Sequence, residues 1–481
     1  MGRGWPVSGV VSMQPIARSL RIASRVALAA AGVAAPAGPL VGQAGDRTAL
    51  AARVDSLAAE AIESGVAAGL SVGVVRGADT LLLEAYGSAD LELGVPTPED
   101  AVYEIGSVTK QFTAAAVLLL AEDGKLSLDD DLSAWMPGYP LGGRAVPLRR
   151  LLDHTSGIKG YTEMPVFGSL AVQRLPRDSL VTLFSAEPFD FEPGEALIYN
   201  NSAYFLLGLI IEKASGTSYE EFVETRVFEA AGMERSRYCH KDELTPGRAK
   251  GYQTGPDGLR PADYLDHTWP YAAGSLCSTV RDLLRWNQAL HGDGEGGDLL
   301  TMASYRTLVT PGTLADGTRL RYAGGLTVTD RDGKRRISHG GGIFGYLSEL
   351  RYFPEEDLSI VVLVNTAGPT SPAAIAATIE DAVLGPEAPI VPRGFGGGLA
   401  PFLGRYRGPA RGRRMTAVVS EAGGELRVRM GAEDPEPVRW LGGTTFANGA
   451  TRFTFVGGGD RFDVLRVDQV GGVYVLHRIR R

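Results

Sequence analysis

Cysteine and histidine are scarce in this 481-residue chain, and their scarcity excludes several kinds of site. Only Cys239 and Cys277 occur, so the chain is not a small disulfide scaffold. Neither cysteine has the neighbouring pattern of a metal ligand or a thiol nucleophile, and the six histidines show no paired spacing. We therefore expect no metal and no cofactor. The two cysteines could form a disulfide in an exported protein or stay as buried thiols, and the sequence leaves both open.

Positive charge is not in excess either. The 48 lysines and arginines are outnumbered by 56 acidic residues, which gives a formal net charge of -8. Nucleic-acid-binding proteins usually present a basic face, and no segment resembles an RNA or DNA module. We expect no nucleic-acid partner.

A long hydrophobic run occurs only near the N-terminus. Arginines precede the apolar stretch VALAAAGVAAPAGPLV, and small residues follow it at Gly42 and Ala44. This pattern predicts a signal peptide over residues 1–44, for which Met13 gives a more usual start than Met1. The run is shorter than the roughly 20 residues of a spanning helix and contains two prolines, so we expect no stable membrane span. A retained anchor is the alternative. No cysteine lies directly after the run, at the position where a lipid would be attached, so the predicted location is periplasmic or extracellular without a lipid anchor.

Residues 45–385 alternate between helical and strand patterns in an order that indicates an α+β fold. A helix and a strand pair come first, a long helical region follows, and strands and a last helix return near the end. This order predicts an antiparallel sheet flanked by helices, with an all-helical lobe inserted between the two halves of the sheet.

The chain changes character after residue 385. Residues 386–400 are a linker rich in proline and glycine, and residues 401–481 carry short alternating segments separated by glycines. These segments predict a small β-barrel or sandwich. Residues 395–481 hold 14 arginines and no lysine against 8 acidic residues. This local positive charge could help the domain dock on the acidic remainder, but an ordinary solvated barrel surface is the favoured explanation.

Three short motifs carry candidate chemistry. In SVTK, Ser107 and Lys110 lie three residues apart at a helix start, so both side chains point the same way and a desolvated amine could take the serine proton. In YNN, Tyr199 offers a phenol that can pass protons and Asn201 an amide that can orient the lysine. Each motif alone is weak, because serine, tyrosine and asparagine at helix starts usually cap and pack.

The third motif is SHGGGIFGY, whose glycines allow a substrate to approach the backbone. Its spacing GxGxxG also suggests a dinucleotide site, but that motif must open a helix and strands follow here. His339, Gly341 and Gly342 are therefore candidates for substrate binding and for an oxyanion hole.

Together, in this order, the motifs resemble those of the serine β-lactamase and penicillin-binding-protein superfamily. The resemblance covers about residues 50 to 385 and is strongest to the class C β-lactamase-like branch, which also holds esterases, D-aminopeptidases and D-alanyl-D-alanine carboxypeptidases. The flanking phrases LLDHTSGI and FEPGEALIYNNSAYFLLG match this branch as well.

The resemblance implies a role for each motif residue. Ser107 would be acylated, Lys110 would be the base, Tyr199 would be base or proton donor, and Asn201 would contact Lys110 and the substrate. The backbone N–H groups of Ser107 and Gly342 would form the oxyanion hole. His154, in LLDHTSGI, is interpreted as structural.

One residue departs from the pattern of many β-lactamases, which have lysine where this chain has His339. Lysine offers a fixed positive charge, whereas histidine near pKa 6.5 offers mainly a hydrogen bond. The leading hypothesis is therefore an exported serine hydrolase acting on esters or on small peptides with D-residues. The alternatives are a β-lactamase and a non-catalytic protein that binds penicillins or peptidoglycan fragments.

Overall fold

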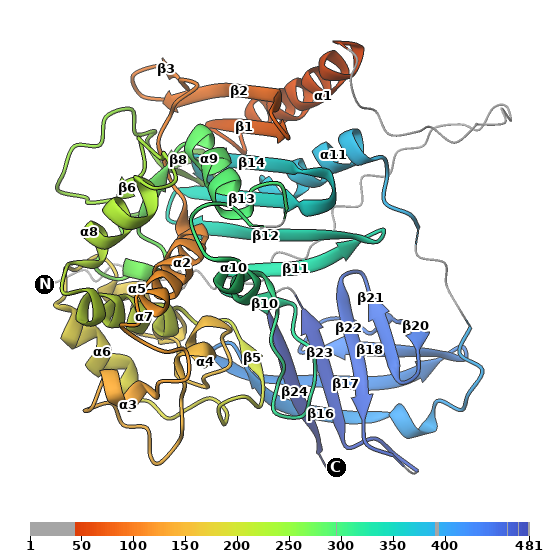
Figure 1. Ribbon diagram of the computed structural model, residues 1–481. Helices are drawn as coiled ribbons and strands as arrows, with labels where there is room; N and C mark the ends of the chain where they lie inside the picture. The colour runs from red at the N-terminus through yellow and green to blue at the C-terminus, as the bar shows by residue number, and fades with distance from the viewer. Residues whose placement is uncertain (1–43, 295, 390–393, 459, 470, 480–481) are drawn as a thin grey trace, which may run out of the picture.

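The computed structural model describes residues 44–479 except 295, 390–393, 459 and 470 (Figure 1). The predicted signal peptide, apart from its last residue, lies outside the described residues. Among the residues described, no helix combines the length and the apolar character needed to cross a membrane. The architecture is α+β, as predicted, with a large sheet, a helical lobe and a second β-structure at the C-terminus.

The large sheet has eight antiparallel strands in the order β10-β11-β12-β13-β14-β1-β2-β3. Strands from both ends of the segment meet at its centre, where β1 pairs with β14 and Val72 lies opposite Val362. The strands are β1 (Gly69–Arg76), β2 (Asp79–Asp90), β3 (Val95–Pro96), β10 (Tyr322–Ala323), β11 (Leu326–Arg331), β12 (Lys334–Ile343), β13 (Tyr346–Phe353) and β14 (Leu358–Val364).

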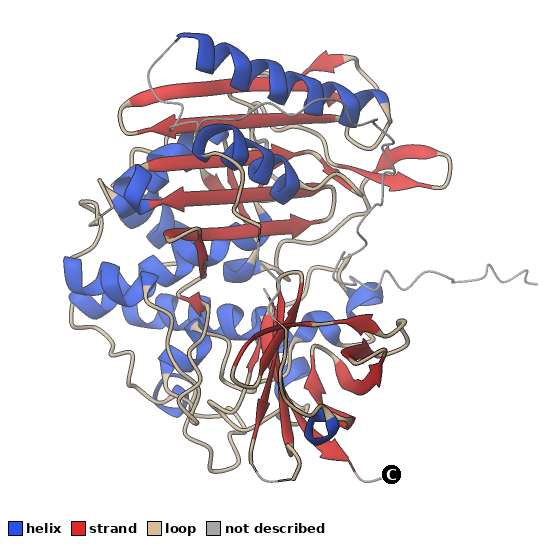
Figure 2. Ribbon diagram, turned by 90° about the vertical axis from the view of Figure 1, so that its right-hand side faces the viewer, coloured by secondary structure: helices blue, strands red, loops and turns tan. Residues whose placement is uncertain are grey.

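Helices cover both faces of this sheet, which explains why its central strands are buried throughout. Helices α1 (Ala44–Glu63) and α11 (Pro372–Leu384) pack on one face through a shared apolar cluster that includes Val54, Val72 and Ile379 (Figure 2). Helix α9 (Val280–His291) packs on the other face. A Cβ at Gly73 would lie 2.3 Å from the Val280 side chain, so glycine permits this close approach.

The lobe between β3 and β10 is mainly helical, and its core is one cluster built around two buried helices, α2 and α7. Its helices are α2 (Thr109–Glu122), α3 (Leu132–Trp135), α4 (Leu148–Leu152), α5 (Phe167–Leu170), α6 (Arg177–Ser185), α7 (Asn201–Ser215), α8 (Tyr219–Val223) and α10 (Met302–Val309), with shorter turns η1 (Gly106–Val108), η2 (Tyr161–Glu163), η3 (Glu224–Phe228) and η4 (Tyr271–Ala273).

The sequence led us to expect an all-helical lobe, and this expectation is wrong. The lobe also carries most of two small three-stranded sheets, whose strands are only two to four residues long. One consists of β4 (Tyr103–Glu104), β9 (Leu276–Ser278) and β6 (Arg237–Tyr238); the other consists of β7 (Tyr252–Gly255), β8 (Gly258–Pro261) and β15 (Thr366–Ala367). Two-residue strands lack the periodicity by which sequence analysis recognises a strand.

Cys239 and Cys277 form a disulfide. Cys277 lies in β9, and Cys239 directly follows β6, the strand that pairs with it. The bridge therefore joins β9, the central strand of the small sheet that contains β4, to the chain just after its edge strand β6. This decides between the two states that the sequence left open.

The C-terminal residues form a strongly curved sheet that nearly closes into a barrel. It runs from β19 through β18, β17, β16, β24, β23, β22 and β21 to β20, so its two end strands are neighbours in the chain. The strands are β16 (Gly404–Ala410), β17 (Arg413–Ala422), β18 (Glu425–Met430), β19 (Glu436–Pro437), β20 (Arg439–Gly442), β21 (Thr445–Asn448), β22 (Thr451–Val456), β23 (Val464–Gln469) and β24 (Gly472–Ile479).

The barrel is joined to the lobe through its core and its backbone. Phe191, Ala196 and Ile198 of the lobe belong to the same apolar cluster as the barrel interior. In addition, β5 (Leu197–Ile198) pairs antiparallel with β24, with Ile198 opposite Gly472. Two ion pairs of opposite sense also join the barrel to the lobe: Arg466 of the barrel pairs with Asp316, whereas Asp468 of the barrel pairs with Arg321 at 2.7 Å.

Candidate active site

Ser107 lies in the short turn η1, where the chain leaves β4 and enters α2. Gly106 has φ +53°, a left-handed conformation that turns the chain sharply before the serine. Ser107 is half-buried, whereas every residue of α2 from Thr109 to Leu120 is buried. The hydroxyl thus lies at the N-terminal end of a buried helix, where the helix dipole favours negative charge.

Lys110 is fully buried in the first turn of α2, and its amine has three polar neighbours. Nζ donates to Asn201 Oδ1 and to the Ala273 carbonyl, both at 2.8 Å, and lies 3.3 Å from Ser107 Oγ. Burial lowers the pKa of Lys110 well below its ordinary value, and the nearby positive charge of Arg411 lowers it further. Glu163 acts in the opposite direction.

Tyr199 and Asn201 reach this lysine from the start of α7. Lys110 Nζ lies 4.7 Å from the centre of the Tyr199 ring. The Tyr199 hydroxyl is buried and makes no hydrogen bond within the described residues. Burial raises the pKa of Tyr199, while the Ser107 hydroxyl and the Arg411 charge lower it. Asn200, the residue between them, caps α7 by accepting from Ala203 N–H at 3.0 Å.

The third motif lies at the end of β12, beside the Ser107 turn. A Cβ at Gly341 would lie 2.1 Å from the Ile105 carbonyl oxygen, and one at Gly106 would lie 2.9 Å from the Gly342 nitrogen. Ser348, opposite Gly341 on β13, donates from Oγ to the same Ile105 oxygen at 2.9 Å. Backbone contact therefore holds Gly341 and Gly342 against the turn that carries the serine.

His339 lies at the same place, but both of its ring nitrogens face protein atoms. Nδ1 lies 2.6 Å from the Gly340 carbonyl oxygen and Nε2 lies 2.9 Å from the Tyr322 hydroxyl. Since a carbonyl can only accept, Nδ1 carries the proton and Tyr322 donates to Nε2. Burial, together with Lys110, lowers the pKa of His339 to about 3. The ring is therefore neutral at pH 7, and neither nitrogen is free to bond a substrate in this arrangement.

His154 lies against Tyr199, at 4.4 Å between ring centres, and is fully buried. Its Nδ1 accepts the Asn200 N–H at 3.2 Å, which ties the LLDHTSGI segment to the YNN motif. Burial lowers the pKa of His154 as well, so the ring is neutral. These packing contacts agree with a structural role.

Sequence reasoning did not identify Thr162, Glu163, Tyr322 or Arg411 as members of the site. Arg411 belongs to the turn between β16 and β17 of the barrel, and its guanidinium lies 5.3 Å from the centre of the Tyr199 ring. It pairs with Glu163, next to Thr162 in η2. No motif marks these residues: Tyr322 reaches His339 through the large sheet and Thr162 reaches Asn201 within the lobe, while Arg411 joins them only when the barrel docks.

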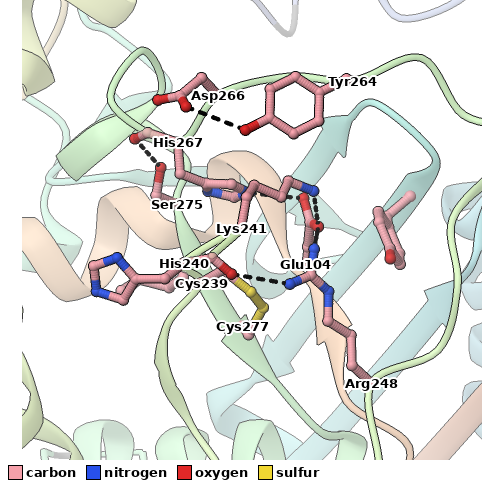
Figure 3. A network of polar contacts seen from close by, with 12 residues as sticks. Glu104, Cys239, His240, Lys241, Arg248, Tyr264, Asp266, His267, Ser275 and Cys277 are labelled. Carbon is pink, nitrogen blue, oxygen red and sulfur yellow. Dashed lines mark hydrogen bonds and ion pairs between the residues drawn. A yellow bond between two sulfur atoms is a disulfide. The ribbon is translucent and has the colours of Figure 1, made fainter. Parts of the chain in front are cut away.

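Glu104, three residues before Ser107, was missed for a different reason: a single glutamate carries no pattern. It is 1% exposed, and its carboxylate binds Lys241, Arg248 and His267 (Figure 3). Burial alone would raise the pKa of Glu104, but its three basic neighbours lower it. The Cys239–Cys277 bridge lies beside this cluster (Figure 3). Together they hold β4 in place behind the Ser107 turn.

All seven candidate residues from the three motifs lie around one site, although they come from three distant segments. Within the ranges that the structure describes, no group of three or more His, Cys, Asp or Glu side chains could hold a metal ion.

This fold and the meeting of the three motifs define the class of the protein, a serine hydrolase. The family model described as Beta-lactamase matches residues 54–384, and the chain belongs to this family. Penicillin-binding protein 4* of Bacillus subtilis is 31% identical over 61% of this chain and 67% of its own length. A D-aminopeptidase of Gluconobacter oxydans is 27% identical over 62% of this chain. The match covers 55% of the length of that D-aminopeptidase.

Among solved structures, the octameric penicillin-binding protein homologue from Pyrococcus abyssi is similar over 89% of this chain and 99% of its own. Its TM-score is 0.61 and its identity 25%.

We expect Gly341→Ala to lower the free energy of unfolding by about 1 to 3 kcal/mol, because its Cβ would strike the Ile105 carbonyl and push β12 from the Ser107 turn. Gly340→Ala is the matched control, since its Cβ would lie 2.9 Å from the end of the Glu349 side chain and at an ordinary contact distance of 3.5 Å from the Ser348 carbonyl oxygen. Chemical denaturation of the three proteins measures the difference. Equal losses in the two variants would show that the strand is not held by backbone contact at Gly341.

Proposed function

We propose that the protein forms an acyl-enzyme at Ser107 and hydrolyses amides or short peptides of D-amino acids. The observation that carries the proposal is the environment of Lys110. A neutral amine has two N–H bonds and one lone pair. With both N–H bonds donated to Asn201 and Ala273, the lone pair is left for the Ser107 hydroxyl, 3.3 Å away.

The reaction then follows from the positions of the groups. Ser107 Oγ forms a bond to the substrate carbonyl carbon while Lys110 takes the hydroxyl proton. The negative charge on the carbonyl oxygen is stabilised by the backbone N–H groups of Ser107 and Gly342. The bond to the leaving amine breaks as that amine receives a proton through Tyr199. A water molecule then gives up a proton and forms a bond to the acyl carbonyl carbon. The bond to Ser107 Oγ breaks as that oxygen regains a proton from Lys110, which releases the acid and restores Ser107.

The proposed substrate class draws on the relatives, because the matched proteins include a D-aminopeptidase. Ester substrates share the same acyl chemistry and remain within the proposal. A β-lactamase is less favoured, because the neutral His339 offers no fixed charge to a β-lactam carboxylate at the third motif.

We also propose that the protein is exported. Two independent observations support this: the N-terminal signal pattern, and a disulfide, which persists mainly in oxidising compartments. We expect a mature N-terminus near residue 45 when the protein is produced in a secreting bacterial host, as read by intact-mass spectrometry. A full-length cytoplasmic product would contradict export.

A fluorophosphonate probe should label the native protein and fail to label Ser107→Ala. Lys110→Ala should slow labelling by about 100-fold or more, since general-base assistance is lost. Because burial lowers the pKa of Lys110, native labelling should rise with pH and level off below the usual lysine range. Circular dichroism checks that the variants fold. Absence of labelling in the native protein would leave the non-catalytic binder as the better account.

Turnover of three chromogenic substrates should separate the substrate classes. We expect a D-alanyl p-nitroanilide to be cleaved faster than its L-enantiomer, and a p-nitrophenyl ester to be cleaved as well. A chromogenic cephalosporin should be turned over more slowly than either, because the third motif lacks a fixed charge. A cephalosporin rate far above the others would make the protein a β-lactamase.

A further inference from the structure

The C-terminal barrel contacts the candidate active site at two separate places. At the first, β24 adds to β5, the strand directly before Tyr199, and the Tyr199 N–H donates to the Gly471 carbonyl at 3.3 Å. At the second, the turn between β16 and β17 reaches the lobe (Figure 1). The tip of this turn is Arg411 and Gly412.

The turn is fitted closely to the lobe. Gly412 has φ +67°, and a Cβ there would lie 2.6 Å from the Glu163 Cβ. Arg411 Nε donates to Glu163 Oε1, and its guanidinium faces the Tyr199 ring. The Glu163 side chain is 12% exposed and the Arg411 side chain 35% exposed. A mostly buried carboxylate thus has its counter-charge supplied by the other domain.

Hydrogen bonds connect this ion pair to the amine of Lys110. Arg411 Nη2 donates to Thr162 Oγ1 at 3.5 Å, and Thr162 in turn donates to Glu163 Oε1 at 2.8 Å. Asn201 Nδ2 donates to the same Thr162 oxygen at 3.2 Å, and Asn201 Oδ1 accepts from Lys110 at 2.8 Å. Thr162 therefore fixes which way the Asn201 amide points, with its oxygen toward the lysine.

The ion pair of Arg411 and Glu163 affects the pKa of Lys110 because the other groups around the amine are uncharged. The other titratable groups close to the amine are Tyr199 and Tyr204, whose rings it faces, and the two buried histidines His154 and His339. Burial keeps these tyrosines and histidines uncharged. The full charges that act on Lys110 therefore come from Arg411, which lowers its pKa, and from Glu163, which raises it.

We propose that Arg411 is a positioning residue of the active site, supplied by the C-terminal barrel: paired with Glu163, it holds Thr162 and Asn201 so that Lys110 presents its lone pair to Ser107. This inference rests on the proposed acyl-enzyme function. It makes the barrel a component of the hydrolase site and not only an attached module.

The test is the pH dependence of fluorophosphonate labelling at Ser107 in the full-length protein. Arg411→Gln removes a positive charge near Lys110, so the acid limb of the profile should move up by about 1 pH unit. Glu163→Gln removes a negative charge, so the limb should move down. The double variant should return toward the native limb, because both charges are gone. Arg411→Lys keeps the charge and should restore the limb.

A matched control comes from the same interface. Arg466→Gln breaks the ion pair with Asp316, also between barrel and lobe, and should leave the limb unchanged. If Arg411→Gln and Glu163→Gln lower the labelling rate without moving the limb, or move it in the same direction, the positioning role is overturned. Absence of Ser107 labelling in the native protein would instead overturn the proposed function, so the two failures are distinguishable.

Discussion

The site depends on one physical constraint, the burial of the Lys110 amine. Moving an ammonium out of water is costly, and a buried lysine reduces the cost by losing its proton. The Asn201 oxygen and the Ala273 carbonyl satisfy its N–H bonds without giving it a direct counter-charge. A buried carboxylate in their place would have kept the lysine protonated and unable to act as a base. The chemistry of the site therefore depends on neutral acceptors around this amine.

Several elements of the fold contribute to that constraint. Helix α2 carries Lys110 into the core of the lobe, and η4 turns the Ala273 carbonyl toward it. Helix α7 brings Asn201, while β12 closes the opposite side with neutral His339. The disulfide and the Glu104 cluster hold β4, so the Ser107 turn has a fixed origin. Contacts with Tyr199 and Glu163 bring the barrel to the site as well.

Much of the large domain could be predicted because its periodicity is strong. The opening helix α1, the strand pair β1 and β2 that follows it, and the last helix α11 occur in the order that the apolar patterns indicated. The small sheets in the lobe could not be predicted, since two-residue strands such as β4 and β6 have no pattern of their own. Likewise, a hydrogen bond between His339 and a substrate requires a ring nitrogen without a protein partner, and the sequence does not show which atoms face the two nitrogens. The structure shows Tyr322 and the Gly340 carbonyl in those places.

The sequence by itself determined which groups are candidates for chemistry. Ser107 and Lys110 share a helix face by their spacing, and the motifs around Tyr199 and Gly341 are local patterns that survive without coordinates. Only the tertiary structure decided that the two cysteines are bridged, that His154 and His339 are neutral, and that Arg411 lies at Tyr199. The reason is physical: pairing, burial and pKa depend on the neighbours of a group in space. Glu163 and Arg411, which are 248 positions apart in the chain, become neighbours only when the domains dock.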